Sequence, residues 1–249
     1  MAKPLKAFEN PEFLQSKEAR SLRILSEYLE PEKRFSYKNI EHTVVFFGSA
    51  RTGEGSGRSD PNAQSYWKAE EMAFKLGMVS KDFEKSGHHF SICTGGGPGI
   101  MEAANRGAER AGAESIGLNI ELPFEQEPNK YISKDLSFEF HYFFMRKLWF
   151  LCHAKAIIVF PGGFGTFDEL FETLTLIQTE KLEKPHFSIM LYDEKHWRDI
   201  IDFEKLAELG MISKKDLSLF TYFSDIDEGI EILKPRLIES IKNTKANCI

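Results

Sequence analysis

Short apolar runs that end in small residues recur along most of the chain. The runs are Thr43–Phe47, Phe90–Cys93, Ser115–Ile120, Ala156–Phe160, His186–Tyr192 and Leu219–Phe223, with Ser137–His141 as a further candidate. Continuous apolar runs of this length are typical of strands in a parallel sheet that is covered on both faces. We therefore predict a strand at each of them.

Between the runs, apolar residues recur at helical spacing. Helices are expected at about 64–86, 99–112, 142–153, 166–181, 196–209 and 226–242, and a further one at 11–29 is expected to be closed by Pro31. Alternating strands and helices indicate an α/β fold with a mostly parallel, doubly wound, Rossmann-like sheet flanked by helices. The helix at 11–29 is expected to pack on the core or on a partner subunit.

Length and composition favour one domain. The chain has 249 residues, of which 42% are hydrophobic, which is enough to fill the core of one α/β domain. We predict a single domain over 1–249, with an amino-terminal helical extension at 1–41 and a nucleotide-binding core at 42–249. Two polar loops, at 51–63 and 122–135, are candidates for lids or for edges of a binding site.

Charge and cysteine content narrow the function classes. A net charge of −6 argues against binding to a nucleic acid polymer, because such surfaces carry a basic excess. The sequence has neither a run of 18 apolar residues nor an apolar signal core at its amino end, so we expect no membrane partner and a cytoplasmic location. Cys93, Cys152 and Cys248 are far apart. They predict buried free thiols rather than a disulfide framework or a metal site.

Three strand-to-helix turns are rich in small residues. They contain Gly48-Ser49, Gly95-Gly96-Gly97 and Gly162-Gly163-Phe164-Gly165-Thr166. At the carboxyl end of a parallel sheet, backbone N–H groups at helix amino termini bind anions, although glycines also make ordinary tight turns. No G-x-x-x-x-G-K-[ST] motif occurs and no G-x-G-x-x-G follows the first strand, so a P-loop is excluded and NAD is disfavoured. We expect another anionic ligand.

The third of these turns leads into a T-x-x-E spacing, formed by Thr166 and Glu169. This spacing at the start of a helix predicts a capping box. It is also compatible with a glutamate that projects into the crevice while the turn presents amides to a phosphate, and the two interpretations are not exclusive. Both interpretations remain open at this point.

Two pairs of cationic residues differ in whether their surroundings favour contact with an anion. Arg146 and Lys147 lie in an otherwise apolar, aromatic helix, where a charge needs a partner, a bound anion or an end that reaches solvent. Arg51 and Arg58 lie in the polar loop 51–63 and are assigned to the surface rather than to a phosphate. The helix with Arg146 immediately precedes the strand that leads to Glu169, which favours a shared crevice.

Together these motifs resemble the Lonely Guy (LOG) family of phosphoribohydrolases, also labelled possible lysine decarboxylases. The resemblance rests on Gly95-Gly96-Gly97-Pro98-Gly99-Ile100-Met101-Glu102, on Arg146-Lys147 and on Pro161-Gly162-Gly163-Phe164-Gly165-Thr166-Phe167-Asp168-Glu169. It implies hydrolysis of the N-glycosidic bond of a nucleoside 5′-monophosphate to free base and ribose 5-phosphate, without a cofactor, by a homodimer or higher homo-oligomer. It also implies that Arg146 and Glu169 are catalytic.

The resemblance extends to the residues that bind the substrate and its phosphate. These are expected to be Gly48, Ser49, Gly95, Gly96, Gly97, Met101, Lys147, Gly162, Gly163, Gly165 and Thr166. The turn G-G-G-P-G-I-M is one residue shorter than the pattern of the short plant enzymes, which favours AMP, or purine monophosphates generally, over cytokinin nucleotides. A non-catalytic carrier or sensor of a nucleotide or of molybdenum cofactor is the alternative. Lysine decarboxylation is disfavoured, because Lys147 is the nearest candidate for a Schiff base and has no distinctive context.

Overall fold

Seven parallel strands form one sheet in the computed structural model, which describes residues 4–60, 63–123, 127–182, 184 and 186–243. The strands are β1 (Thr43–Phe47), β2 (Ser91–Thr94), β3 (Ser115–Ile120), β4 (Ser137–Phe140), β5 (Ala154–Val159), β6 (Ser188–Tyr192) and β7 (Phe220–Phe223). Their order is β4-β3-β2-β1-β5-β6-β7, and every neighbouring pair is parallel. The predicted strands and the doubly wound fold are confirmed.

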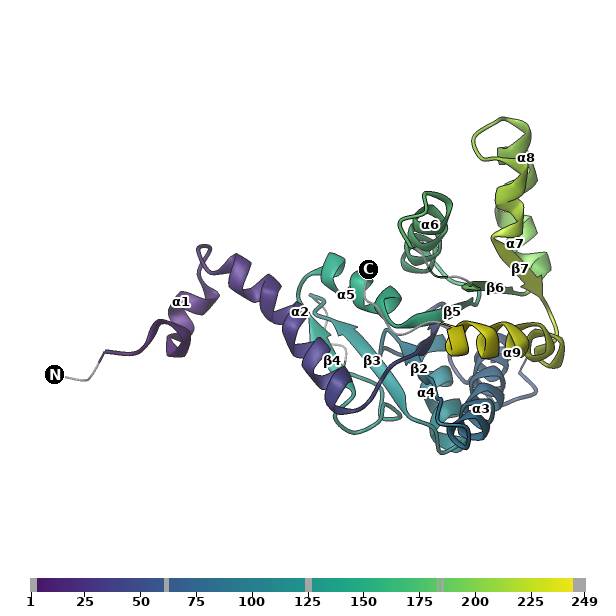
Figure 1. Ribbon diagram of the computed structural model, residues 1–249. Helices are drawn as coiled ribbons and strands as arrows, with labels where there is room; N and C mark the ends of the chain where they lie inside the picture. The colour runs from purple at the N-terminus through teal and green to yellow at the C-terminus, as the bar shows by residue number, and fades with distance from the viewer. Residues whose placement is uncertain (1–3, 61–62, 124–126, 183, 185, 244–249) are drawn as a thin grey trace.

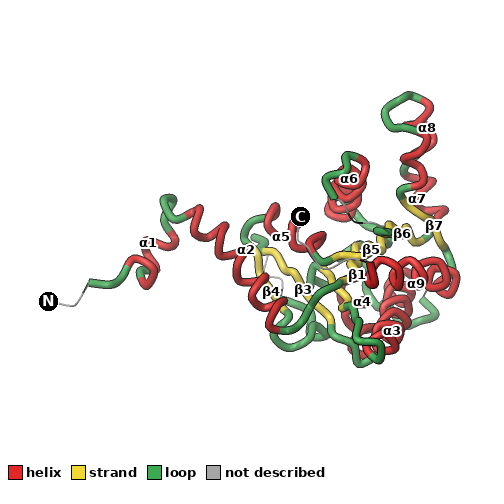
Figure 2. Tube along the Cα trace, viewed as in Figure 1, coloured by secondary structure: helices red, strands yellow, loops and turns green. Residues whose placement is uncertain are grey.

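Helices cover both faces of the sheet (Figures 1 and 2). One layer contains α3 (Gln64–Glu84), α4 (Ile100–Arg110) and α9 (Ile226–Asn243); the other contains α2 (Arg20–Tyr37), α5 (Phe143–Cys152), α6 (Phe164–Gln178), α7 (Glu194–Ile200) and α8 (Phe203–Glu208). Along β1, Val44 and Phe46 face the first layer, while Val45 and Phe47 face the second. Because both faces are buried, the strand is apolar from Val44 to Phe47.

The predicted helix at 11–29 is wrong in its bounds. The structure has a short helix, α1 (Pro11–Gln15), followed by α2, which continues through Pro31. A proline inside a helix leaves the carbonyl four residues earlier without its donor. Here that carbonyl belongs to Glu27, and it accepts a hydrogen bond from Trp149 Nε1 at 3.0 Å. The tertiary contact with α5 therefore replaces the bond that Pro31 removes.

The amino-terminal helices leave the body of the molecule. In Figure 1, α1 and the first turns of α2 project to one side, whereas Phe35 near the end of α2 is buried in the core. The projecting part exposes Leu22, Leu25 and Leu29.

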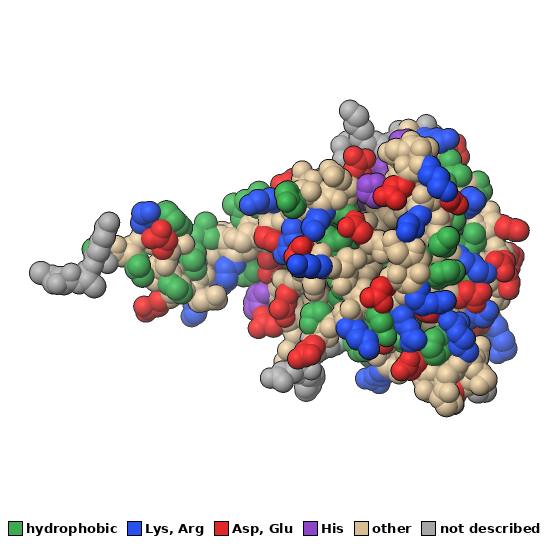
Figure 3. Space-filling view, turned by 90° about the horizontal axis from the view of Figure 1, so that it is seen from below, with side chains coloured by type: hydrophobic (Ala, Val, Ile, Leu, Met, Phe, Trp, Pro, Cys, Tyr) green, Lys and Arg blue, Asp and Glu red, His purple; other side chains and the backbone are tan. Residues whose placement is uncertain are grey.

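On the face seen in Figure 3, lysines and arginines are interspersed with acidic side chains.

The predicted helix at 196–209 is divided into α7 and α8. Ile201 between them is extended, and Asp202 begins the second helix by accepting a hydrogen bond from the backbone N–H of Lys205 at 2.8 Å. An aspartate at this position favours a new helix start. A short 3₁₀ helix (Lys214–Ser218) then leads into β7.

The cysteines only partly follow the sequence prediction. Cys93 on β2 is buried and free, as predicted. Cys152 at the end of α5 is buried but disulfide-bonded, so the prediction of a free thiol there is wrong. Cys248 lies outside the described residues.

In the described ranges, no helix is both long enough and apolar enough to cross a bilayer.

Candidate active site

The strand order reverses between β1 and β5, which lie side by side at the centre of the sheet. In a doubly wound sheet, the crevice beyond the carboxyl ends of the strands at such a point is where ligands bind. The turn after β1 is held between the other two glycine-rich turns. Ser49 donates its backbone N–H to Pro161 O at 3.0 Å, and its carbonyl accepts from Ile100 N at 3.0 Å.

A cavity of about 990 Å³ opens at this point. It is lined by Phe47, Gly48, Ser49, Ala50, Arg51, Gly95, Gly97, Met101, Asn119, Ile120, Leu122, Phe143, Arg146, Phe150, Gly163, Phe164, Gly165, Thr166, Phe167, Asp168, Glu169 and Ile200. Ten of the residues predicted from the sequence are therefore brought together. Gly96, Gly162 and Lys147 are not among the lining residues in the described part of the chain.

The turn after β2 is held by buried polar side chains. Thr94 accepts from the backbone N–H of Gly96 at 2.9 Å and donates to Asn105 Oδ1 at 2.8 Å. Asn129, from the loop after β3, donates to the carbonyls of Gly96 and Gly97, both at 3.0 Å. This turn is consequently a packed scaffold in which the carbonyls of Gly95, Gly96 and Gly97 accept hydrogen bonds from side chains of the protein.

The turn after β5 is open by comparison. A Cβ atom built on Gly163 or Gly165 meets no atom within 4 Å. Gly163 is the N-cap of α6, so the free N–H groups of the first helical turn and the positive end of the helix dipole lie at the cavity. Thr166 is the third residue inside the helix and no side chain caps it. The capping-box prediction is therefore wrong.

Glu169, the sixth residue of α6, is buried beside the cavity with 9% of its surface exposed. No partner residue in the described ranges forms a hydrogen bond or an ion pair with its carboxylate. Burial raises the pKa of this carboxyl from 4.5 to about 7, and the positive charges of Arg146 and Lys147 oppose the rise. Glu169 can thus gain or lose a proton near neutral pH.

Arg146 reaches the cavity from α5, on the side of the sheet occupied by β2 and β3. Its Nε donates to Leu118 O at 2.7 Å and its Nη2 to Gly95 O at 3.4 Å. Burial lowers the pKa of the guanidinium, while the charge of Glu169 raises it. The partner expected for a charge in this apolar helix is found in backbone carbonyls, and the guanidinium lines the cavity with its charge retained.

Lys147 points to a different place. Its ammonium donates to Asp168 Oδ1 at 2.8 Å and lies 3.4 Å from Glu172 Oε2. Asp168 and Glu172 belong to α6, so these ion pairs join α5 to α6, and of the three side chains only Asp168 lines the cavity. Adjacent residues on α5 therefore serve two surfaces, with Arg146 at the cavity and Lys147 between the helices.

Several lining residues were missed by the sequence prediction. Phe143, Phe150, Phe164 and Ile200 belong to helices whose apolar pattern suggests only core packing, yet Phe164 is 96% exposed at the cavity mouth. Asn119 could have been predicted, because it is a polar residue near the end of an apolar strand. Phe164 comes with the glycine-rich turn that contains it, whereas packing of the fold brings Phe143, Phe150 and Ile200 to the site.

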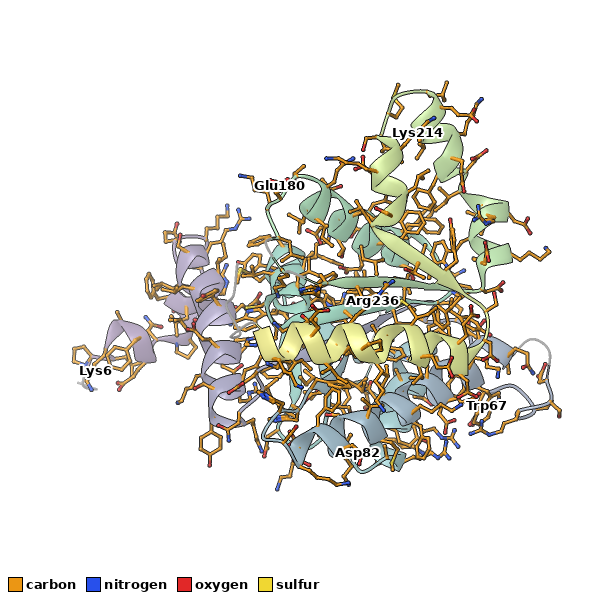
Figure 4. The ribbon with its side chains drawn as sticks, turned by 45° about the vertical axis from the view of Figure 1, so that its right-hand side comes forward. Lys6, Trp67, Asp82, Glu180, Lys214 and Arg236 are labelled. Atoms are coloured by element: carbon orange, nitrogen blue, oxygen red, sulfur yellow. The ribbon has the colours of Figure 1, made fainter. Side chains whose placement is uncertain are left out.

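The loop at 51–63 is tied to α3 and α4 in its described part. The carbonyl of Glu54 accepts from Trp67 Nε1 at 3.1 Å, and its carboxylate pairs with Arg106 at 2.8 Å. Arg58 pairs with the buried Glu70 at 2.6 Å. Figure 4 labels Trp67 beside this loop. Residues 61 and 62 lie outside the described residues, and Arg51 at the start of the loop lines the cavity.

Known proteins are similar to this chain at the level of the family. The family model described as "Possible lysine decarboxylase" matches residues 101–233, more than half of the chain. Cytokinin riboside 5′-monophosphate phosphoribohydrolase LOG1 of Arabidopsis thaliana is 27% identical over 165 residues, which are 63% of this chain and 70% of that protein.

Solved structures share the fold at lower identity. The molybdenum cofactor binding protein of the phototrophic bacterium Rippkaea orientalis is 20% identical with a TM-score of 0.50, over 78% of this chain and 96% of that one. The molybdenum cofactor carrier protein of Chlamydomonas reinhardtii is 18% identical with a TM-score of 0.49, over 80% and 99%. Since the family model matches more than half of the chain, the chain belongs to the possible lysine decarboxylase family, also known as the LOG family.

Proposed function

We propose that this protein hydrolyses the N-glycosidic bond of nucleoside 5′-monophosphates and releases free base and ribose 5-phosphate. The observation that carries the proposal is Glu169, a buried carboxyl without a partner among the described residues, at a cavity that begins at the open amino end of α6. A perturbed pKa at such a cavity is typical of catalytic groups. The related Arabidopsis protein is named for this type of reaction.

The chemistry suits the position of Glu169. As the bond between C1′ and the base nitrogen breaks, positive charge develops on the ribose, and a carboxylate beside C1′ stabilises it. The same carboxylate orients the attacking water and takes its proton as the new C1′–O bond forms. The bonding electrons leave with the base, which takes up a proton. Glu169 acts in its ionised form, which is substantially populated above about pH 7.

The open turn suits the phosphate. At Gly163 and Gly165 an anion can approach the first amides of α6 without meeting a side chain. Thr166 on the same turn of helix is buried at the cavity and offers a hydroxyl. Holding the phosphate there fixes the ribose relative to Glu169, and such positioning contributes strongly to hydrolysis rates.

Arg146 acts on the same reacting centre. Its positive charge lowers the pKa of Glu169 and so increases the fraction of ionised carboxylate. Its two hydrogen bonds to Leu118 O and Gly95 O hold the guanidinium in one orientation. We assign it to the balance of charge around Glu169 and the leaving base.

The test is release of base and ribose 5-phosphate by the intact, purified protein from AMP, from other purine monophosphates and from cytokinin riboside monophosphates. Glu169→Gln is expected to lower the rate by about 10²- to 10⁴-fold, the range for a positioned acid–base group. Glu172→Gln is the matched control, because this glutamate lies on α6 against Lys147 and does not line the cavity. No release from any of these nucleotides by the unaltered protein would refute the proposal.

Pyridoxal phosphate chemistry, which the family's descriptive label suggests, does not fit the cavity. Such chemistry needs a lysine that forms a Schiff base with the cofactor. No lysine lines the cavity in the described ranges, and Lys147 is committed to Asp168 and Glu172. We therefore derive no decarboxylation step.

A non-catalytic carrier of a nucleotide or of molybdenum cofactor is the second candidate. The observation that favours it is the cavity volume, about 990 Å³, which is at the upper end for small-ligand sites. Mass spectrometry of the protein purified without added ligand separates the two. Intact nucleotide or pterin that stays bound without turnover supports the carrier, whereas ribose 5-phosphate supports the hydrolase.

A further inference from the structure

The backbone of Arg51 is held where the three glycine-rich turns meet. Its N–H donates to Ser49 Oγ at 3.0 Å, and Ser49 in turn is bonded to Pro161 and to Ile100. Because the turns after β2 and β5 both hold Ser49, Arg51 leaves the sheet at a defined place. Arg51 lines the cavity there, two residues after Ser49, which lies against Gly162 just before α6, and directly after Ala50, which lies against Gly99 just before α4.

The side chain of Arg51 differs from every other arginine in the described ranges. The others each contact a carboxylate, a carbonyl, a hydroxyl or an aromatic ring; Arg58, for example, pairs with Glu70 at 2.6 Å. No such contact to the guanidinium of Arg51 exists among the described residues. An arginine that lines a cavity and has no protein partner is available to a ligand.

The charged residues around the cavity leave one role unassigned, the cation that contacts a phosphate. Among its described lining residues, the charged ones are Arg51, Arg146, Asp168 and Glu169. Arg146 is bonded to two backbone carbonyls and faces Glu169, while Asp168 is paired with Lys147. A phosphate at the amino end of α6 would meet helix amides there but no other cation. Arg51 is the residue that can supply this charge.

We infer that Arg51 binds the substrate's phosphate and so selects phosphorylated nucleosides over unphosphorylated ones, an inference that rests on the proposed function. A guanidinium offers parallel N–H donors that match two phosphate oxygens. The amides of α6 hold the phosphate from one side and Arg51 closes the other. Arg51 is exposed, as the sequence suggested, and the proposal adds a ligand to its role, whereas Arg58 pairs with Glu70.

The experiment compares AMP with adenosine in Arg51→Met, Arg51→Lys and Arg236→Met. Arg236 is an exposed arginine on α9, labelled in Figure 4, so its variant removes the same charge away from the cavity. Arg51→Met is expected to lower kcat/KM for AMP about 10- to 100-fold, the range for a hydrogen bond to a charged group, with a smaller loss for adenosine. Arg51→Lys keeps the charge but not the paired donors and should fall between. Arg236→Met should match the unaltered protein.

The outcomes separate the two proposals. If the unaltered protein hydrolyses AMP and Arg51→Met keeps the same ratio of AMP to adenosine activity, the role of Arg51 is overturned while the hydrolase stands. If the unaltered protein releases no base, calorimetric titration with AMP and adenosine decides. Weaker AMP binding by Arg51→Met then supports the phosphate contact without the hydrolase, and no AMP binding by the unaltered protein overturns both. The Tm of each variant checks that it is folded.

Discussion

The turns after β2 and β5 are both rich in glycine, yet they use it for opposite purposes. In the turn after β2, Gly99 has a φ of +73°, and a Cβ there would collide with the backbone of Ser49 and Ala50. In the turn after β5, Gly163 and Gly165 border open space. Glycine thus permits close packing of protein on protein at the first turn and close approach of a ligand at the second.

The helices that follow the turns repeat this contrast. The buried Asn105 of α4 is hydrogen-bonded to Thr94 and Asn129, so its side chain is paired. On α6, the buried Glu169 has no partner among the described residues, and burial raises its pKa to about 7. A buried group without partners lowers stability. The hydrogen-bonded scaffold is therefore concentrated at the turn after β2, and the reactive groups, whose burial lowers stability, at the turn after β5.

The largest expected effect concerns the pH dependence of stability. The pKa of Glu169 is about 7 in the folded protein against 4.5 in its ordinary state, so folding is favoured most below about pH 4.5 and this contribution is lost as the pH rises to about 7. The full difference is roughly 3 kcal/mol. Urea unfolding at pH 5 and pH 8 should show a larger fall for the unaltered protein than for Glu169→Gln. An equal fall in the free energy of unfolding for the two proteins would show that Glu169 is not the group with the raised pKa.

Gly99→Ala should damage the scaffold turn. The new side chain requires an unfavourable positive φ and displaces the backbone at Ser49, so a loss of about 3 kcal/mol in the free energy of unfolding is expected. Chemical denaturation measures it. A stability within about 0.5 kcal/mol of the unaltered protein would show that glycine is not required for packing there.

Gly165→Ala should have the opposite profile. A methyl group at this position meets no atom within 4 Å, so the free energy of unfolding should change by less than about 1 kcal/mol, with a gain from the better helix former. Because the methyl group lies where a phosphate would approach, AMP hydrolysis should fall by about 10-fold. Unchanged hydrolysis with unchanged stability would contradict the role of this turn in binding.

The smallest expected effect concerns Lys147, whose positive charge acts on the pKa of Glu169 although Lys147 does not line the cavity. Activity should decline as the pH falls below about 7, because Glu169 becomes protonated. Lys147 lowers the pKa of this carboxyl, so Lys147→Gln should move the decline to higher pH. The pH profile of kcat/KM measures the shift. A profile that moves to lower pH would contradict the proposed electrostatic coupling.

Much of the fold followed from local patterns. Short apolar runs predicted six of the strands, because a strand covered on both faces is mostly apolar, while the edge strand β4, which exposes Glu139, was only a further candidate. The helix ends were predicted less well. Pro31 did not end α2, because Trp149 supplies the donor that its neighbour Glu27 lacks, and α7 and α8 separate at Asp202, whose side chain caps the second helix.

The sequence by itself determined the α/β fold, the glycine-rich turns and the candidate pair Arg146 and Glu169, since all of these depend on residue type and spacing. Only the tertiary structure decided that Lys147 pairs with α6 while Arg146 lines the cavity, that Thr166 lies inside a helix rather than at its cap, and that Arg51 stands without a partner among the described residues. The physical reason is that pairing, burial and free space depend on residues distant in the chain, which meet only when the strands β1, β2 and β5 end at one crevice.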